Sequence, residues 1–246
     1  SFNTIVEAIK WGRGIYNNFQ RYLQFTLTVN VIAFLLTIIS QLLDQPLPFT
    51  TIHLLWVNII MDGPPALALG LEPIRQTVMR RKPTSKNASI INRFMVQTII
   101  GNSIFMILVL LAQLQFNFLG ADVTHVTRGA SESQTVIFSL FVSLVLFNAL
   151  NCREFGLVSI IPNFCKNKTA LKILGATFAI QILVTQLASG FFNTVPLSFM
   201  MWIKIILLGS SVVLFSEIVK CVLRLINLKR KKKRQEQKVI QNVTAS

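Results

Sequence analysis

The chain has 246 residues, 52% of them hydrophobic, and a formal net charge of +15. Its mean hydropathy of +0.60 excludes an ordinary soluble basic domain and indicates a protein that crosses a membrane several times. The first residue is Ser1, and the opening resembles no signal peptide. We therefore expect a chain that was processed or cut from a longer protein.

Six apolar runs occur, and most of them approach or exceed the ~20 residues that cross ~30 Å of hydrocarbon, although the second and fourth are short or interrupted. Their positions along the chain are 23–43, 53–71, 94–114, 135–150, 171–187 and 200–225. The fourth run is short but can extend outward through 131–134. We predict an all-α, polytopic membrane bundle of six transmembrane helices. It comprises a cytoplasmic stalk at 1–22, a six-helix domain at 23–228 and a basic cytoplasmic tail at 229–246.

The basic residues predict the orientation of these helices. Every Lys and Arg except Arg128 and Lys204 lies before the first run, within or next to every second connection, or from Lys220 onward. Because cytoplasmic loops are rich in Lys and Arg, both termini are predicted to be cytoplasmic. Cys152, Cys165 and Cys221 then lie at cytoplasmic helix ends, where we expect reduced thiols and no metal site.

Asn30 is a polar residue within the first run, which reads FLQFTLTVNVIAFLL. A single amide in a membrane helix is commonly an interhelical hydrogen-bonding group. Only nine residues, Asp44–Ile52, join the first two runs, so these are predicted to be antiparallel neighbours. Since the second run carries polar residues at similar depth, the amide can equally be an ion ligand.

Asp62 lies near the middle of the second run, in LLWVNIIMDGPPALALGLEP. A carboxylate at the bilayer centre costs roughly 2.5 to 3.5 kcal/mol on insertion scales, so a bound cation or proton is expected to offset it. Asn58 precedes it by one helical turn on the same face. Gly63-Pro64-Pro65 follows, and its prolines deprive the carbonyls of Ile60 and Met61 of their helical donors. These oxygens predict a site for a hard cation such as calcium.

The remaining sequence features indicate no catalytic group. No GxxxxGK[ST] motif and no soluble stretch long enough for a catalytic domain occur, so the chain alone should not hydrolyse ATP. Glu217 is explained by snorkelling or by pairing with Lys220. The tail LKRKKKRQEQK predicts attraction to anionic lipid headgroups rather than to nucleic acid. It carries no aromatic anchor typical of a calmodulin target.

Two long motifs carry a resemblance to a known family. The runs WGRGIYNNFQRYLQFTLTVN and LLWVNIIMDGPPALALGLEP, with FNALNCREFG further on, resemble P-type calcium-transporting ATPases of the plasma-membrane type and their bacterial relatives. The resemblance implies the last six of ten membrane helices of the transport domain. It also implies a strand-to-stalk junction at the opening of the chain. The chain's own upstream domains would bind ATP and magnesium and carry the phosphorylated aspartate.

The same resemblance implies the ligands of the transported ion. Asn30, Asn58 and Asp62 match the single calcium site of the plasma-membrane type, with an acid of an upstream helix supplying further charge. Ala33 and Val145 stand where two-site pumps have acidic ligands. The implied function is therefore the export of one calcium ion per cycle, with the plasma membrane favoured over an internal membrane.

Three alternatives remain beside this interpretation. The sequence Met61–Ala66 is also typical of secretory-pathway pumps, which carry manganese as well as calcium. A proton-coupled secondary transporter would use Asp62 as its titrating carboxylate. A structural membrane domain would hold Asn30, Asn58 and Asp62 as a buried polar clamp. A DKTGT motif upstream of Ser1 would favour the ATPase over the last two.

Overall fold

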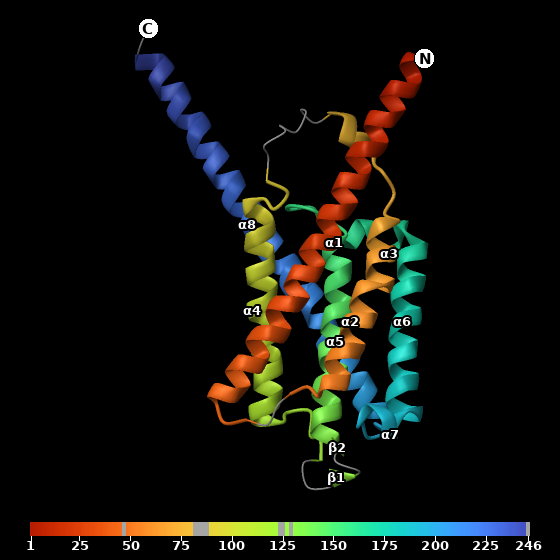
Figure 1. The fold of residues 1–246 in the computed structure, drawn as a ribbon. Helices are drawn as coiled ribbons and strands as arrows, with labels where there is room; N and C mark the ends of the chain where they lie inside the picture. Colours follow the sequence, from red (N-terminus) through yellow and green to blue (C-terminus); the bar gives the residue numbers. More distant parts are fainter. Residues whose placement is uncertain (46–47, 81–88, 123–125, 128–129, 245–246) are drawn as a thin grey trace.

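The computed structural model describes residues 1–45, 48–80, 89–122, 126–127 and 130–244, without the side chains of 61–62, 76–77, 126–127, 130, 230–236 and 238–244 (Figure 1). Six of its helices are long and apolar enough to cross a membrane, which confirms the predicted all-α membrane bundle. The described strands are two antiparallel pieces of two residues each.

The elements follow one another as helices joined by short connections. In chain order they are α1 (Phe2–Leu42), α2 (Thr51–Asp62), α3 (Pro64–Gly70), η1 (Gln76–Arg80), α4 (Arg93–Phe116), β1 (Val126–Thr127), β2 (Ala130–Ser131), α5 (Glu132–Cys152), η2 (Ile161–Lys166), α6 (Lys168–Leu187), α7 (Ser189–Phe192) and α8 (Phe199–Thr244). The predicted outward extension of the fourth span is confirmed, because α5 begins at Glu132.

Side-chain caps set the start of four membrane helices. Before each of α2, α4, α5 and α6 stands a residue whose side-chain oxygen accepts the backbone N–H of the third residue along. The four caps are Thr50, Asn92, Ser131 and Asn167. Such a cap satisfies one of the N–H groups that a helix start leaves without an intrahelical partner. The boundaries of these spans are thus local properties of the sequence.

The opening of the chain differs from the expectation of a strand-to-stalk junction. Helix α1 begins at Phe2 and continues without interruption to Leu42, so the stalk is helical from its first turn. Extending a helix that already exists adds one hydrogen bond per residue without a new nucleation step. The same reasoning explains α8, whose backbone remains helical through the basic tail to Thr244.

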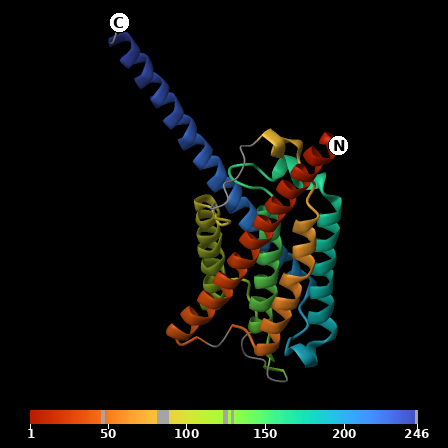
Figure 2. The same cartoon turned by 45° about the horizontal axis from the view of Figure 1, so that its top comes forward.

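Helix α5 forms the centre of the bundle. Its most apolar stretch is 94% buried, whereas the corresponding stretches of the other five spans are 28–39% buried. In Figures 1 and 2, α4 lies to one side of it and α2, α3 and α6 to the other, while α1 crosses the bundle diagonally. Its most extensive contact is with α8. There Gly209 allows close approach, since a Cβ at that position would lie 2.1 Å from Ser143 Oγ.

Both termini lie at the same end of the bundle (Figure 1). The opposite end carries the α1–α2 connection, the β1–β2 hairpin and α7. An even number of spans requires this arrangement, and the basic connections lie at the end that holds the termini. Which end faces the cytoplasm remains a prediction from the distribution of Lys and Arg.

Cysteine labelling tests that prediction. Cys165 and Cys221 are exposed, whereas Cys152 is buried. In sealed right-side-out vesicles of the full-length protein, we expect an impermeant maleimide to modify none of the three. After the vesicles are opened, Cys165 and Cys221 should react and Cys152 should stay silent. An exposed reporter at the other end, Phe118→Cys, should react in sealed vesicles. Labelling of Cys165 from outside would contradict the orientation.

Candidate ion-binding site

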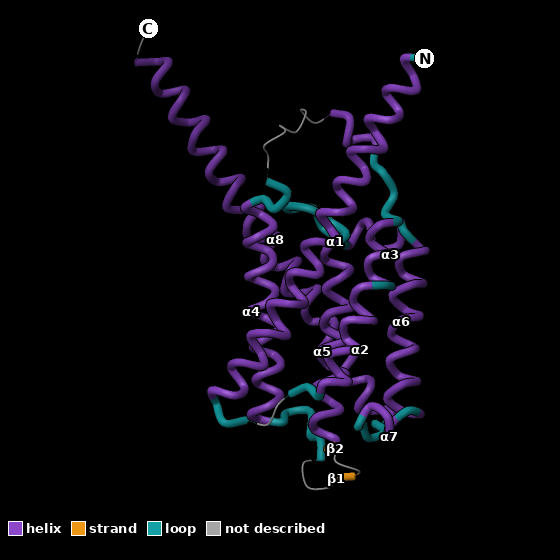
Figure 3. The backbone as a smooth tube through the Cα atoms, viewed as in Figure 1, coloured by secondary structure: helices purple, strands orange, loops and turns teal. Residues whose placement is uncertain are grey.

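The second membrane span is broken where the sequence predicts it. Helix α2 ends at Asp62, Gly63 links the two pieces, and α3 begins at Pro64 (Figure 3). Proline is suited to the first turn of a helix, where its missing N–H is not needed. In an unbroken helix, however, the N–H groups of residues 64 and 65 would bind the carbonyls of Ile60 and Met61. These two carbonyl oxygens are therefore without helical donors at the break.

Two of the predicted ligands lie on the outer surface of the bundle that this chain forms. The side chains of Asn30 on α1 and Asn58 on α2 are exposed. Their neighbours point the other way, since Val29, Val57 and Ile60 are almost completely buried. Helices α1 and α2 are in contact and run antiparallel, which confirms the predicted neighbourhood. Neither amide bonds to a described residue. Both therefore face a side that this chain leaves open.

The third predicted ligand is located by its backbone alone. Asp62 is the last residue of α2, one turn after Asn58. Its side chain lies outside the described part of the structure, so its role as a ligand remains a prediction. Among the described residues, no group of three or more His, Cys, Asp and Glu side chains gathers to hold a metal ion.

The N-terminal part of α2 is fixed to the neighbouring helices α5, α6 and α7. His53 Nε2 lies 2.7 Å from the carbonyl oxygen of Phe192, and the imidazole stacks on Phe138 with 4.1 Å between ring centroids. Trp56 Nε1 donates a hydrogen bond of 2.8 Å to Gln181 Oε1. These contacts anchor α2 to α5, α6 and α7 just before the segment that carries Asn58 and Asp62. His53 thus has a structural role in holding the start of α2.

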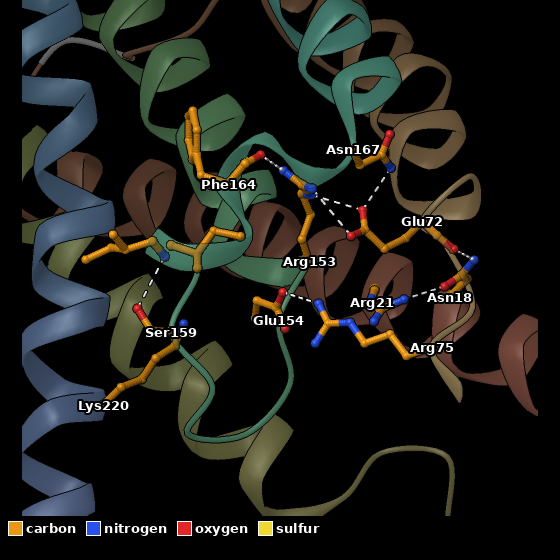
Figure 4. A network of polar contacts seen from close by, with 12 residues as sticks. Asn18, Arg21, Glu72, Arg75, Arg153, Glu154, Ser159, Phe164, Asn167 and Lys220 are labelled. Carbon is orange, nitrogen blue, oxygen red and sulfur yellow. Dashed lines mark hydrogen bonds and ion pairs between the residues drawn. The ribbon is translucent and has the colours of Figure 1, made fainter. Parts of the chain in front are cut away.

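The inner end of the broken helix is held by a buried ion pair (Figure 4). Glu72 follows α3, and its side chain is 4% exposed. Arg153, which is completely buried, donates from Nε to Glu72 Oε2 at 3.0 Å and from Nη2 to Oε1 at 3.4 Å. Asn167 Nδ2 donates to the same carboxylate at 3.0 Å. The remaining guanidinium nitrogen of Arg153 donates to the carbonyl of Phe164 at 3.0 Å.

Helix α1 is connected to the backbone next to this ion pair by the side-chain amide of Asn18. Asn18 Nδ2 donates to the carbonyls of Gly70 at 2.7 Å and Glu72 at 3.1 Å. Arg21 in turn donates to Asn18 Oδ1, and its guanidinium lies 5.2 Å from the centre of the Phe155 ring. We call the set Asn18, Glu72, Arg153 and Asn167 the inner junction. It connects α1, α3 and the α5–α6 connection at one point.

Sequence reasoning missed the inner junction. Arg153 was counted only as one of the basic residues of a connection, and Glu72 was assigned no role. An acidic residue directly after an apolar run was the available signal, but its partners lie 81 and 95 residues away. By contrast, the short-range pairing of Glu217 with Lys220 is confirmed at 3.1 Å.

Comparison with known proteins identifies the family. The profile described as "Cation transporting ATPase, C-terminus" matches residues 46–222, which is most of the chain. The chain belongs to the cation-transporting ATPase family. The matched region of this ATPase includes α2, α3, the Gly63 break and all later membrane helices. The recognition made from the two long motifs is thereby confirmed.

Three relatives of this chain are calcium-transporting ATPases by name. The chain is 37% identical to putative calcium-transporting ATPase 11, plasma membrane-type, of Arabidopsis thaliana, over 90% of the chain and 22% of the relative. It is 35% identical to probable calcium-transporting ATPase 6, plasma membrane-type, of Oryza sativa subsp. japonica, with the same coverage. Plasma membrane calcium-transporting ATPase 2 of Oreochromis mossambicus is 30% identical, over 90% and 20%. The chain thus spans about a fifth of the length of these relatives.

Proposed function

We propose that this chain is the ion-carrying membrane region of an ATP-driven calcium pump. The observation that supports it best is that Asn30 on α1 and Asn58 on α2 both face outward, and that the Gly63 break follows α2 directly. Calcium prefers six to eight oxygen ligands from carboxylates, amides, carbonyls and water. Asp62 would supply charge, the two amides neutral oxygens, and the freed carbonyls of the break further oxygens. The names of the relatives support calcium as the ion.

The exposed position of the amides fits a site that other parts of a longer pump complete. An amide facing hydrocarbon has no water with which to exchange hydrogen bonds, so it requires a polar partner on that side. The relatives contain about four fifths of their length outside the matched region. We infer that a membrane segment from that part covers the face of α1 and α2 and adds a carboxylate. Phosphorylation in a separate domain would then move the helices, with the Gly63 break absorbing the local rearrangement.

Ion-dependent phosphorylation of the full-length protein tests this function. We expect the formation of a phosphorylated intermediate from ATP to require free calcium. Half-maximal formation should occur at ~10⁻⁷–10⁻⁵ M, the range of Kd values of calcium-sensor sites built from oxygen ligands. Chelation of calcium should abolish the intermediate. Phosphorylation that proceeds equally with and without calcium would contradict the proposal.

Manganese is the second candidate ion, because Met61–Ala66 is also typical of secretory-pathway pumps. The same assay should include manganese in place of calcium at matched free concentration. Equal or stronger stimulation by manganese would assign the chain to the secretory-pathway type. Stimulation by calcium alone would favour the plasma-membrane type. An ATP-independent, proton-driven uptake would support the secondary transporter instead.

We further propose that one ion is bound per cycle. Val145 lies completely buried in the apolar core, and Ala33 packs against that core. Neither offers an oxygen, whereas a second calcium would need about six to eight ligands of its own and compensating charge. We expect a Hill coefficient near one for calcium activation, and one labelled calcium ion per phosphorylatable site in equilibrium binding. A plateau at two ions would contradict the single site.

A further inference from the structure

We propose that Glu72 is a positioning residue for the ion site, because the inner junction couples the stalk part of α1 to the broken helix. This inference rests on the proposed function. The residue touches no ion in the proposal. It fixes α3, and through α3 the break that carries Asp62, relative to both α1 and the α5–α6 connection.

The burial of the charges makes the inner junction a single unit. Removing a carboxylate and a guanidinium from water has an effective penalty of several kcal/mol per ion, which only close geometry and further hydrogen bonds offset. Glu72 accepts two N–H groups from Arg153 and one from Asn167, with its side chain 4% exposed. Separating Glu72 from Arg153 would leave two buried charges without compensation. The contacts should therefore persist together or break together.

Asn18 carries the connection to α1. The last carbonyls of a helix have no intrahelical donors. At the end of α3 and just beyond it, the carbonyls of Gly70 and Glu72 accept hydrogen bonds from the side-chain amide of Asn18 instead. One side chain of α1 thus caps the C-terminal end of α3. Any axial shift or rotation of α1 at this level must either carry α3 with it or break two hydrogen bonds.

The distances along the helices place the inner junction where it can set the register of the ligands. Asn30 follows Asn18 on the uninterrupted α1 by twelve residues, or about 18 Å of helical rise. Asp62 precedes Gly70, the last residue of α3 and one of the two whose carbonyl groups Asn18 binds, by eight residues, or about 12 Å of helical rise. The segments that carry Asn30 and Asp62 therefore both extend from the inner junction, over lengths of the same order. On the α3 side, Gly63 is the first interruption between the inner junction and α2.

If the ion pair of Glu72 and Arg153 had only a structural role, the expected result would be different. It would affect only how much pump folds, leaving the calcium concentration for half-maximal phosphorylation of each folded molecule unchanged. A positioning residue shifts that concentration even in molecules that fold normally. The two roles can be separated by measuring calcium activation per folded pump, with phosphorylation by inorganic phosphate counting the folded molecules.

The test uses two variants of the full-length pump, each of which disrupts one part of the inner junction. We call them the inner-junction lesions. Glu72→Gln combined with Arg153→Met removes both charges, so no orphaned charge is left in the interior, whereas removal of one partner alone would be strongly destabilising. Asn18→Ala removes the connection to α1 and leaves the ion pair intact. We expect each to raise the calcium concentration for half-maximal phosphorylation about tenfold, the scale of energetic coupling between linked sites.

Each of the two lesions has a matched control substitution. Glu217→Gln removes a carboxylate of α8 that accepts hydrogen bonds from Lys220, Ser159 and the backbone N–H of Ile160, none of which belongs to the broken helix. Gln20→Ala removes a side-chain amide of α1 that donates to the carbonyl of Ile90 at 2.6 Å. We expect both controls to keep the wild-type calcium dependence within about twofold, less than the coupling expected of linked sites.

The outcomes separate this inference from the proposed function. If Asp62→Asn abolishes calcium activation while both inner-junction lesions leave it unchanged, the ion site stands and the positioning role is wrong. If the controls shift calcium dependence as much as the lesions, the effect is nonspecific and the inference is also wrong. If Asp62→Asn itself retains normal activation, the proposed site fails, and the positioning role fails with it. A shift in the lesions alone, with Asp62→Asn inactive, supports both.

Discussion

Replacing Asp62 by Asn in the full-length pump should abolish phosphorylation by ATP at physiological calcium concentrations. The change preserves size but removes the negative charge that the proposed site contributes to the ion. Charge count tunes the calcium affinity of oxygen sites over several orders of magnitude, so we expect the calcium requirement to rise about 100-fold or more. Phosphorylation by inorganic phosphate, which needs the ion-free state, should continue. Both reactions are measured with radiolabelled phosphate in the same membranes.

Asp44→Asn is the matched control for this prediction. Asp44 is exposed in the α1–α2 connection, where the same chemical change lies outside the helices. It has a positive φ of 53°, a conformation that asparagine also tolerates. The control should therefore keep normal calcium activation. If Asp62→Asn instead pumped with near-normal affinity, Asn30, Asn58 and Asp62 would be better explained as a structural polar clamp.

Gly209→Leu should cause the largest loss of folded protein among changes outside the ion site. A Cβ at Gly209 would lie 2.1 Å from Ser143 Oγ, 3.0 Å from Ser143 Cβ and 3.2 Å from Phe147 Cδ2. The hydroxyl can rotate, but a full leucine must separate α8 from the central helix α5. Overpacking of this kind costs about 1–3 kcal/mol and occasionally more. We expect a lower melting temperature and a smaller monodisperse fraction after detergent extraction.

Gly175→Leu provides the comparison. A Cβ at Gly175 on α6 meets no atom within 4 Å, so the same side chain can be accommodated there. Its propensity effect is similar, because both glycines lie inside membrane helices. Equal stability of the two variants would show that α5 and α8 are not held at the distance that the structure describes.

Several features of the fold could be predicted because their causes are local. The six spans follow from apolar length, and the interruption of the second follows from prolines that lack an N–H. The placement of both termini at one end follows from the even number of spans. The recognition of the family depended on two motifs, which are contiguous and specific. Asn30 and Asn58 could be selected because a polar residue inside an apolar run is visible in the sequence itself.

The sequence by itself thus determined the spans, the helix break and the candidate ligands, but tertiary structure alone decided which surfaces meet. Helices α4 and α5 are about equally apolar, yet 94% of the most apolar stretch of α5 is buried and only 39% of that of α4. Hydropathy cannot distinguish them, since lipid tails are as apolar as a protein core. The outward direction of Asn30 and Asn58 likewise depends on which helix faces pack. The pairing of Glu72 with Arg153 and Asn167 spans more than eighty residues of chain, and only packing brings a compensating charge to each buried ion.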